Sequence, residues 1–175
     1  ESLHQVVHPI DRFSPGGSTI TDFNCNGELD LLLLDFENSR MMVLEGNSKA
    51  SFTPLEIFPS AKGPLSAVSW DSPRGSIILV AHLPEAKLIS YRLDSSGKLE
   101  RTDSLDLKQY QRDYKMKPRM VHKLGDSCGQ NGGWIALGDG GQAIQGRISA
   151  RGQIHVDETY LPLAVGEPYR FVVAD

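Results

Sequence analysis

The chain has 175 residues, of which 39% are hydrophobic, and it carries a formal net charge of −4. This length suits one domain with an ordinary apolar core, and the mild acidity offers no basic field for nucleic acid or anionic lipid. The longest apolar run, residues 29–36, has the length of a strand and falls far short of the roughly 20 residues of a membrane helix.

The N-terminal residues 1–13 lack the charged start and apolar middle of a signal peptide, so we expect any secretion signal to be absent from this sequence. Residues 4–10 (HQVVHPI) have the character of an outer β-strand without neighbours. Cys25 and Cys128 lie far apart and outside any zinc spacing. They would pair only in an oxidising compartment, and two separate thiols are the favoured interpretation.

Three units follow, and each contains four short strands. The first unit spans residues 17–60, the second 64–108 and the third 117–164. Each begins with a short strand, continues with a strongly apolar strand such as LDLLLLDF, and ends with two more alternating strands. Glycine and proline are spaced between these runs, which is typical of all-β chains.

The units repeat with a period of about 50 residues, the length of a β-propeller blade. The best match aligns KLISYRLDSSGKL, from Lys87, with QAIQGRISARGQI, from Gln142. A four-stranded sheet of this kind must be covered by its neighbours on both faces. The sequence therefore predicts an all-β fold of β-propeller blades; an ordinary sandwich with accidental similarity is the alternative.

The last segment, residues 168–175 (PYRFVVAD), resembles the first strand of a further blade and ends in register at Asp175. We therefore predict one partial propeller domain over residues 1–175, with three complete blades and one orphan strand at each end. Its uncovered ends predict partners in the form of other propeller blades, from the same precursor or from another chain.

The loop DFNCNGELD of the first unit places oxygen-bearing side chains at positions 1, 3, 5 and 9, with glycine at position 6. A hard cation needs about six converging oxygens, and glycine permits the tight turn that brings them together. The spacing predicts a calcium site. The alternative is a polar hairpin whose side chains serve the turn geometry alone.

This loop and the apolar strand after it resemble the FG-GAP/VCBS repeat of integrin α-chains and bacterial secreted propellers, with its pattern DxDxDGxxD. The resemblance implies a structural calcium ion, with the Glu28 carbonyl as one ligand and side-chain ligands from Asp22, Asn24, Asn26 and Asp30. It also implies adhesion or ligand recognition. Asparagine at positions 3 and 5 lowers the charge and the expected affinity. The other two units carry Arg74 and a glycine-rich loop at this place, and we expect no metal there.

Other candidates are weaker. GDSCG, around Ser127, matches a protease nucleophile motif in part, but no neighbouring motif supplies a triad. Asp35, His82 and Asp139 are expected at equivalent strand ends on one rim, which would be a binding face or merely solvated loop edges. Trp70 and Trp134 are expected to pack between blades. The basic and aromatic stretch 107–119 is interpreted as a solvated linker.

The favoured interpretation is a non-enzymatic recognition or scaffolding module that is secreted, periplasmic or extracellular, holds calcium, and binds a protein or glycan through its rim loops. We expect no nucleic-acid partner and no membrane insertion. The alternative is a propeller portion of a larger secreted hydrolase or oxidoreductase whose active site lies outside this chain. The fold does not fix the ligand.

Overall fold

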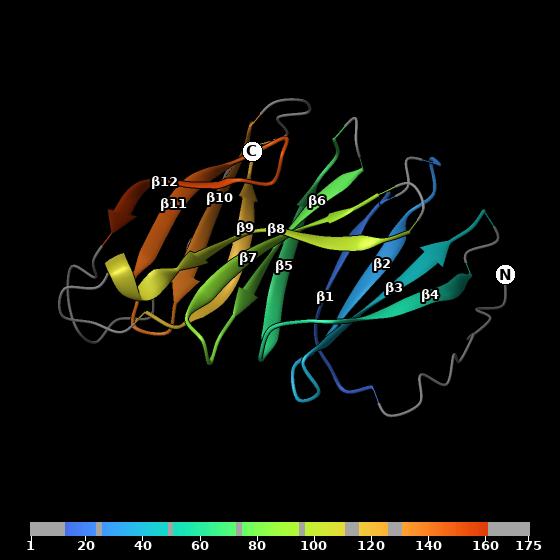
Figure 1. The fold of residues 1–175 in the computed structure, drawn as a ribbon, viewed down its shortest axis with the longest axis horizontal. Coiled ribbons are helices and arrows are strands. Elements are labelled where there is room, and N and C mark those ends of the chain that lie inside the picture. Colours follow the sequence, from blue (N-terminus) through green and yellow to red (C-terminus); the bar gives the residue numbers. More distant parts are fainter. Residues whose placement is uncertain are drawn as a thin grey trace, which may run out of the picture.

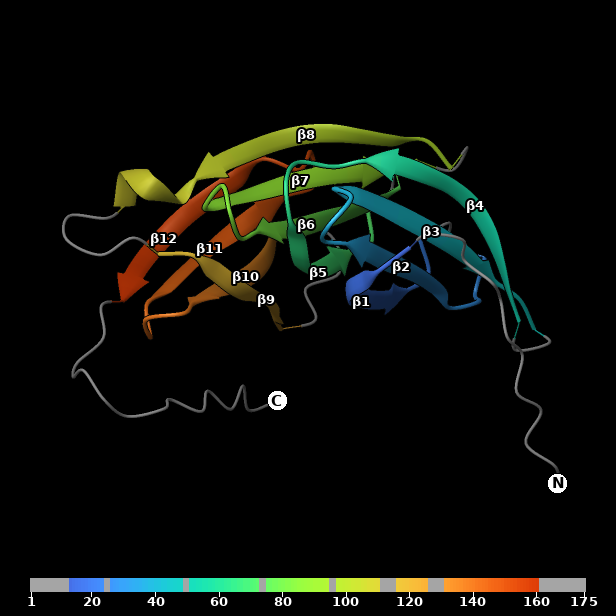
Figure 2. The ribbon, with the colours of Figure 1, turned by 90° about the horizontal axis from the view of Figure 1, so that it is seen from below.

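The computed structural model describes residues 13–23, 26–48, 51–72, 75–94, 97–110, 116–125 and 131–160. These residues form three four-stranded antiparallel sheets that stand side by side (Figures 1 and 2). Each sheet is a meander in which every strand pairs with its neighbour in sequence. The predicted all-β fold of propeller blades is confirmed. The orphan strands predicted at 4–10 and 168–175 lie outside the described residues.

We name the sheets blade 1, blade 2 and blade 3. Blade 1 contains β1 (Pro15–Thr21), β2 (Asp30–Asp35), β3 (Arg40–Gly46) and β4 (Phe52–Pro59). Blade 2 contains β5 (Pro64–Trp70), β6 (Ser76–His82), β7 (Lys87–Leu93) and β8 (Leu99–Asp106), followed by the 3-10 turn η1 (Leu107–Tyr110). Blade 3 contains β9 (Pro118–Leu124), β10 (Asn131–Gly138), β11 (Ala143–Ser149) and β12 (Ile154–Tyr160).

The first strands of the blades, β1, β5 and β9, lie next to one another. The backbones of β1 and β5 approach closely, since a Cβ atom at Gly17 would stand 2.2 Å from the Leu65 carbonyl oxygen. Between β5 and β9, the Ser66 hydroxyl accepts a hydrogen bond from the Val121 N–H at 3.1 Å. These three strands therefore form the inner edge of the arc.

Each first strand begins with proline and then contains a one-residue bulge. The bulges lie after Pro15, after Pro64 and after Pro118, at the same place in the three blades. Proline suits this position because it has no N–H to donate to a ladder. The extra residue bends the strand and turns its side chain out of the regular alternation.

The core lies in two layers between the blades. One cluster joins blades 1 and 2, and the other joins blades 2 and 3. Because side chains alternate across a strand, the middle blade must be apolar on both faces. Every residue of β6 is accordingly buried.

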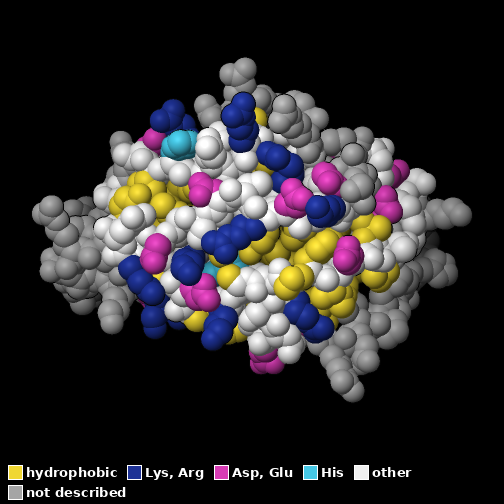
Figure 3. Space-filling view, in the orientation of Figure 1, with side chains coloured by type: hydrophobic (Ala, Val, Ile, Leu, Met, Phe, Trp, Pro, Cys, Tyr) yellow, Lys and Arg dark blue, Asp and Glu magenta, His cyan; other side chains and the backbone are white. Residues whose placement is uncertain are grey.

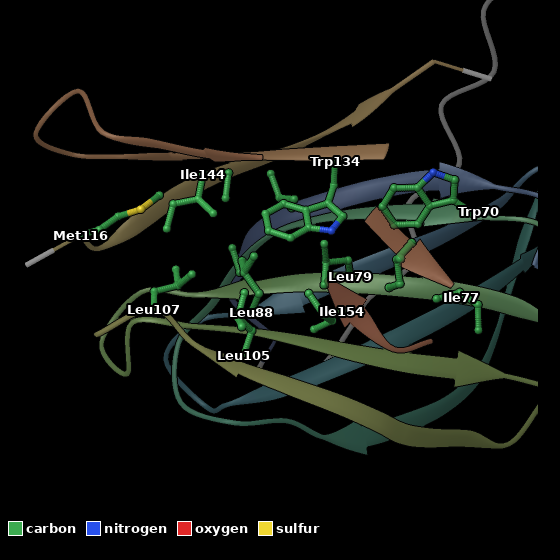
Figure 4. Close-up of a cluster of buried hydrophobic side chains, with 14 residues drawn as sticks. Trp70, Ile77, Leu79, Leu88, Leu105, Leu107, Met116, Trp134, Ile144 and Ile154 are labelled. Atoms are coloured by element: carbon green, nitrogen blue, oxygen red, sulfur yellow. The ribbon is translucent and has the colours of Figure 1, made fainter. Parts of the chain in front are cut away.

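Two glycines make room for the tryptophans of the second cluster, whose rings lie between blades 2 and 3 (Figure 4). A Cβ atom at Gly132 would stand 2.3 Å from Trp70 Nε1, and one at Gly146 would stand 2.5 Å from Trp134 Cζ2. Trp134 is fully buried and Trp70 is 5% exposed. Both are packing residues between blades, as predicted.

Candidate functional site

The hairpin between β1 and β2 is held together by its own polar side chains. The Asp22 carboxylate accepts hydrogen bonds from the N–H groups of Asn26 and Gly27, at 3.0 and 2.8 Å. The Asn26 side-chain oxygen accepts one from the Glu28 N–H at 2.8 Å. Gly27 has a φ of 86°, which glycine adopts without strain.

Asp30 has a different role at the base of this hairpin. Asp30 is 2% exposed, and its two carboxylate oxygens accept hydrogen bonds from the N–H groups of Phe23 and Gly46, at 2.8 and 2.9 Å. It thus joins the start of the hairpin to the end of β3. A buried carboxylate needs such partners, because leaving it unpaired would be costly.

The calcium prediction is neither supported nor excluded by this geometry. Of the predicted ligands, Asp22, Asn26, Glu28 and Asp30 are described, and Asn24 lies outside the described residues. Among the residues that the structure describes, no group of three or more His, Cys, Asp or Glu side chains converges on a metal position. The hydrogen bonds of Asp22 and Asp30 match the polar-hairpin alternative. Each carboxylate oxygen keeps a second lone pair, so calcium at this loop stays a prediction.

The ends of the second strands share one rim, along the lower edge of Figure 1. There, Asp35 lies opposite Pro15, and His82 lies opposite Pro64. In blade 3 the residue opposite Pro118 is Gly138. The residue equivalent to Asp35 and His82 is therefore Gly138, and the expected equivalence of Asp139 is wrong by one residue. Sequence spacing missed this because the turn after the second strand is one residue shorter in blade 3, where Leu137 pairs with Ala143, than in blade 2, where Ala81 pairs with Leu88.

Asp35 is fully buried and tied into its own turn. It accepts hydrogen bonds from Arg40 Nη2 at 2.7 Å and from Asn38 Nδ2 at 2.8 Å. Burial alone would raise the pKa of this carboxyl, but the hydrogen bonds from Arg40 and Asn38 outweigh it and hold the pKa below its usual value. The Arg40 guanidinium also lies 5.3 Å from the centre of the Phe13 ring. Asp35 is thus a structural residue.

His82 is also fully buried, between blades 1 and 2. Neither ring nitrogen makes a hydrogen bond of ordinary geometry, and the ring centre lies 6.5 Å from that of Tyr91. Burial lowers the pKa of His82 to about 4, and the backbone of Lys62 and Ala61 and the charge of Glu85 oppose this shift only in part. Burial raises the pKa of Tyr91. His82 is therefore neutral near pH 7 and is closed off from solvent.

The accessible part of the rim is at the start of β9. Arg119 is the bulge residue of the inner strand, and its Nη2 lies 3.8 Å from Oδ2 of Asp139, with side chains 53% and 35% exposed. Lys117 and Lys62, which precede β9 and β5, are exposed as well. Figure 3 shows Lys and Arg side chains along the lower edge of the molecule, on the side of blades 2 and 3. The sequence analysis did not single out Arg119. The proline that begins each inner strand could have indicated the bulge, and with it the place of Arg119 on the rim.

Two further sequence candidates are only partly described. Ser127 and both cysteines lie outside the described residues. The stretch 107–119, interpreted as a linker, contains η1 and the first residues of β9, and residues 111–115 lie outside the description. No helix among the described segments has the length and hydrophobicity to cross a membrane.

No protein-family model matches this chain, and no curated protein matches it. Solved structures do. A Lactobacillus plantarum protein solved in a structural-genomics programme is 14% identical, with a TM-score of 0.59, over 87% of this chain and 42% of its own. A putative 6-phosphogluconolactonase from Bacteroides fragilis is 14% identical, with a TM-score of 0.59, over 82% and 41%. The periplasmic gluconolactonase of Pseudomonas aeruginosa is 14% identical, with a TM-score of 0.55, over 79% and 38%.

These similarities correct two interpretations. The FG-GAP/VCBS resemblance is wrong, because the similar solved structures include proteins named as lactonases, and no family model supports integrin-type repeats. The motif that suggested it, the loop DFNCNGELD, is rich in Asp, Asn and Gly, and these residues are common in hairpin turns that bind no metal. The expectation that the chain is not part of an enzyme is overturned too, because two of these proteins are named as a gluconolactonase and a putative 6-phosphogluconolactonase.

At 14% identity the comparison shows the fold and leaves the activity to be argued. The chain spans about two fifths of the length of each of these structures. Its described residues form an arc of three β-propeller blades, in a fold that proteins named as lactonases share.

Proposed function

We propose that this chain is a propeller portion of a hydrolase that opens lactones of sugar acids, and that it works outside the cytoplasm. The observation that carries the proposal is the fold similarity to two proteins named as lactonases, over 79% and 82% of this chain. One of the two is named as periplasmic. The remaining catalytic residues would come from blades beyond this chain.

Lactone hydrolysis sets clear chemical demands. A water oxygen forms a bond to the ring carbonyl carbon, negative charge gathers on the carbonyl oxygen, and the bond to the ring oxygen breaks. One water proton passes to the departing ring oxygen, which becomes a hydroxyl, and the other is released to solvent as the acid ionises to a carboxylate. A general base near the water and a fixed cation near the developing oxyanion both accelerate this reaction.

Arg119 and Asp139 meet these demands better than the other rim groups. Their contact of 3.8 Å is long for an ion pair, and both side chains are partly exposed, so a ligand can approach either. In this assignment Asp139 holds the water and takes its proton, and Arg119 faces the oxyanion and then the product carboxylate. Asp35 and His82 are excluded from these roles because both are fully buried.

The test is hydrolysis of glucono-1,5-lactone, followed by proton release and corrected for spontaneous opening, together with binding of gluconate measured by calorimetry. Arg119→Gln and Asp139→Asn should lower kcat/KM, and Arg119→Gln should weaken gluconate binding. Lys98→Gln is the matched control, since it also breaks an exposed ion pair, Lys98–Glu100, but on blade 2 away from this rim. Because the remaining catalytic residues are assigned to other blades, these measurements use the protein with its complete set of blades. Absence of both hydrolysis and gluconate binding in that protein contradicts the proposal.

A further inference from the structure

The sequence contains two Asn-Gly pairs, and the structure places them in opposite surroundings. Asn26 and Gly27 lie in the β1–β2 hairpin, and both are exposed. Asn131 and Gly132 lie at the start of β10, where Gly132 is buried and pairs with Ile148 of β11. An Asn-Gly pair readily loses the side-chain amide, because glycine has no Cβ atom to hinder attack of its backbone nitrogen on the preceding Asn side chain. The surroundings of each pair should therefore decide which one reacts.

The backbone nitrogen of Gly27 carries a proton that already has an acceptor. Its N–H donates a hydrogen bond to Oδ2 of Asp22 at 2.8 Å. The Asn26 N–H donates to Oδ1 of the same carboxylate at 3.0 Å, which fixes the orientation of that group. A general base must lie within hydrogen-bond reach of the proton that it removes. The Asp22 carboxylate meets this condition for the Gly27 N–H.

The Asn26 side chain is held as the electrophile. Its Oδ1 accepts a hydrogen bond from the Glu28 N–H at 2.8 Å, an Asx turn that folds the side chain back over the Gly27 peptide. When a nitrogen attacks Cγ, negative charge gathers on Oδ1, where the Glu28 N–H stabilises it. A Cβ atom at Gly27 would have no described atom within 4 Å outside its chain neighbours. The hairpin thus leaves space for the attack and for water.

The second pair is held in an unreactive arrangement. Asn131 and Gly132 belong to the antiparallel β10–β11 ladder, in which they pair with Ser149 and Ile148. An extended backbone turns each amide nitrogen away from the side chain of the preceding residue. A Cβ atom at Gly132 would stand 2.3 Å from Trp70 Nε1, so the indole covers this glycine. Ring closure here would require the start of β10 to leave the sheet.

We propose that the β1–β2 hairpin modifies itself at Asn26, with Asp22 as the base. Asp22 takes the proton of the Gly27 N–H, and the Gly27 nitrogen forms a bond to Cγ of Asn26. The bond from Cγ to Nδ2 breaks, and Asp22 returns the proton to the leaving nitrogen, which departs as ammonia. Water then opens the succinimide ring at either carbonyl and leaves aspartate or isoaspartate at position 26. Water is the only co-reactant, and the proposal does not depend on the enzymatic function.

The modification should weaken the hairpin in two ways. It places a negative charge at position 26 beside the Asp22 carboxylate, and like charges repel. Isoaspartate also moves a side-chain carbon into the main chain between residues 26 and 27. Both changes act on the loop that the hydrogen bonds of Asp22 and Asn26 hold together.

The test is peptide mapping by mass spectrometry of the protein with its complete set of blades, kept folded at neutral pH and sampled over weeks. Conversion raises the peptide mass by the difference between a hydroxyl and an amino group, and fragmentation locates the position. We expect Asn26 to convert while Asn131 stays intact. In the same protein denatured in guanidinium, the two pairs should convert at similar rates. The proposal is overturned if Asn26 stays intact in the folded protein, or if both pairs convert equally there.

Two variants at Asp22 test the base. Asp22→Asn keeps an acceptor oxygen but removes the basic carboxylate, so conversion of Asn26 should slow several-fold. Asp22→Glu is the matched variant, because it keeps a carboxylate and should convert faster than Asp22→Asn. Circular dichroism should confirm that both variants fold. Conversion in Asp22→Asn at the wild-type rate or above would show that the hairpin does not catalyse its own modification, which also overturns the proposal.

Discussion

Gly152 in the β11–β12 turn of blade 3 lies directly against Thr102 in β8 of blade 2. A Cβ atom at residue 152 would stand 2.3 Å from Thr102 Oγ1. The Gly152 carbonyl accepts hydrogen bonds from the hydroxyls of Thr102 and Ser90, and the nearby Ile154 N–H donates to Asp103 at 2.8 Å. Blades 2 and 3 are therefore joined by polar contacts to one tight turn as well as by their apolar cluster.

Gly152→Ala should destabilise the protein by displacing this turn. Gly152 has a φ of 80°, which costs a side chain about 1 kcal/mol, and the contact with Thr102 should add about 1–3 kcal/mol of overpacking. Gly97 occupies the same turn position in blade 2, with a φ of 81° and no atom within 4 Å of its added Cβ. Denaturant unfolding of Gly97→Ala should thus show the backbone cost alone. Equal losses in the two variants would mean that the Thr102 contact contributes nothing.

His82 should make stability depend on pH in a mildly acidic window. Its pKa of about 4 in the folded state lies below the usual 6.5, so the unfolded chain binds the proton more readily. Stability is then complete above pH 6.5 and falls by about 3 kcal/mol as the pH drops to 4. The charged groups that act on the ring are Glu85, which opposes the shift, and Arg101, which adds to it.

His82→Leu should remove most of this slope and leave the protein folded at pH 7, since a neutral buried ring with no hydrogen bond is replaced by an apolar side chain. Thermal unfolding between pH 4 and 7 measures the dependence of stability on pH in both proteins. Gln153→Ala, at an exposed position just before β12, is the control and should keep the wild-type slope, because it changes no titratable group. If His82→Leu also keeps it, some other group carries the pH dependence.

Gly132 and Trp70 should be coupled across blades 2 and 3. Gly132→Ala places a methyl group against the Trp70 indole and should cost about 2–3 kcal/mol. Trp70→Phe alone should also destabilise, because it leaves a gap. The double variant should be more stable than the sum of the two losses predicts, by about 1 kcal/mol or more. Strict additivity in a double-mutant cycle would show that the two side chains do not compete for space.

Calcium should raise the unfolding midpoint if the sequence prediction for the β1–β2 hairpin holds. Metal-free protein is titrated to millimolar calcium, and binding to the folded state alone shifts the midpoint upward. Magnesium at the same concentration is the control for ionic strength. Asn26→Ala should reduce the shift, because it removes a predicted oxygen ligand. A midpoint unmoved by calcium leaves the polar hairpin as the whole explanation of this loop.

The fold could be predicted from the sequence because each repeat consists of strand-length apolar runs separated by turns. The apolar run from Leu29 and the match between Lys87 and Gln142 were enough to predict propeller blades. Residue equivalence across blades could not be predicted, since the turn between the second and third strands is one residue shorter in blade 3 than in blades 1 and 2, and this places Gly138 rather than Asp139 at the rim.

The candidate site was harder to predict than the fold. The pairing of Arg119 with Asp139 crosses from an inner strand to a turn 20 residues later, and no local pattern encodes it. The DxDxDG-like spacing misled the family assignment because the same residue types serve turns in many proteins. Burial of Asp35 and His82 follows from how the turns of neighbouring blades pack, which strand periodicity does not reveal.

Ser76, at the start of β6, donates a hydrogen bond through its hydroxyl to the Phe23 carbonyl at 3.2 Å. Phe23 is also the residue whose N–H is held by Asp30. The β1–β2 hairpin of blade 1 is consequently connected to blade 2 by a direct hydrogen bond. A change in the conformation of this hairpin, caused by an ion, an oxidant or a ligand, should therefore also alter the start of β6, so that the stabilities of blades 1 and 2 change together.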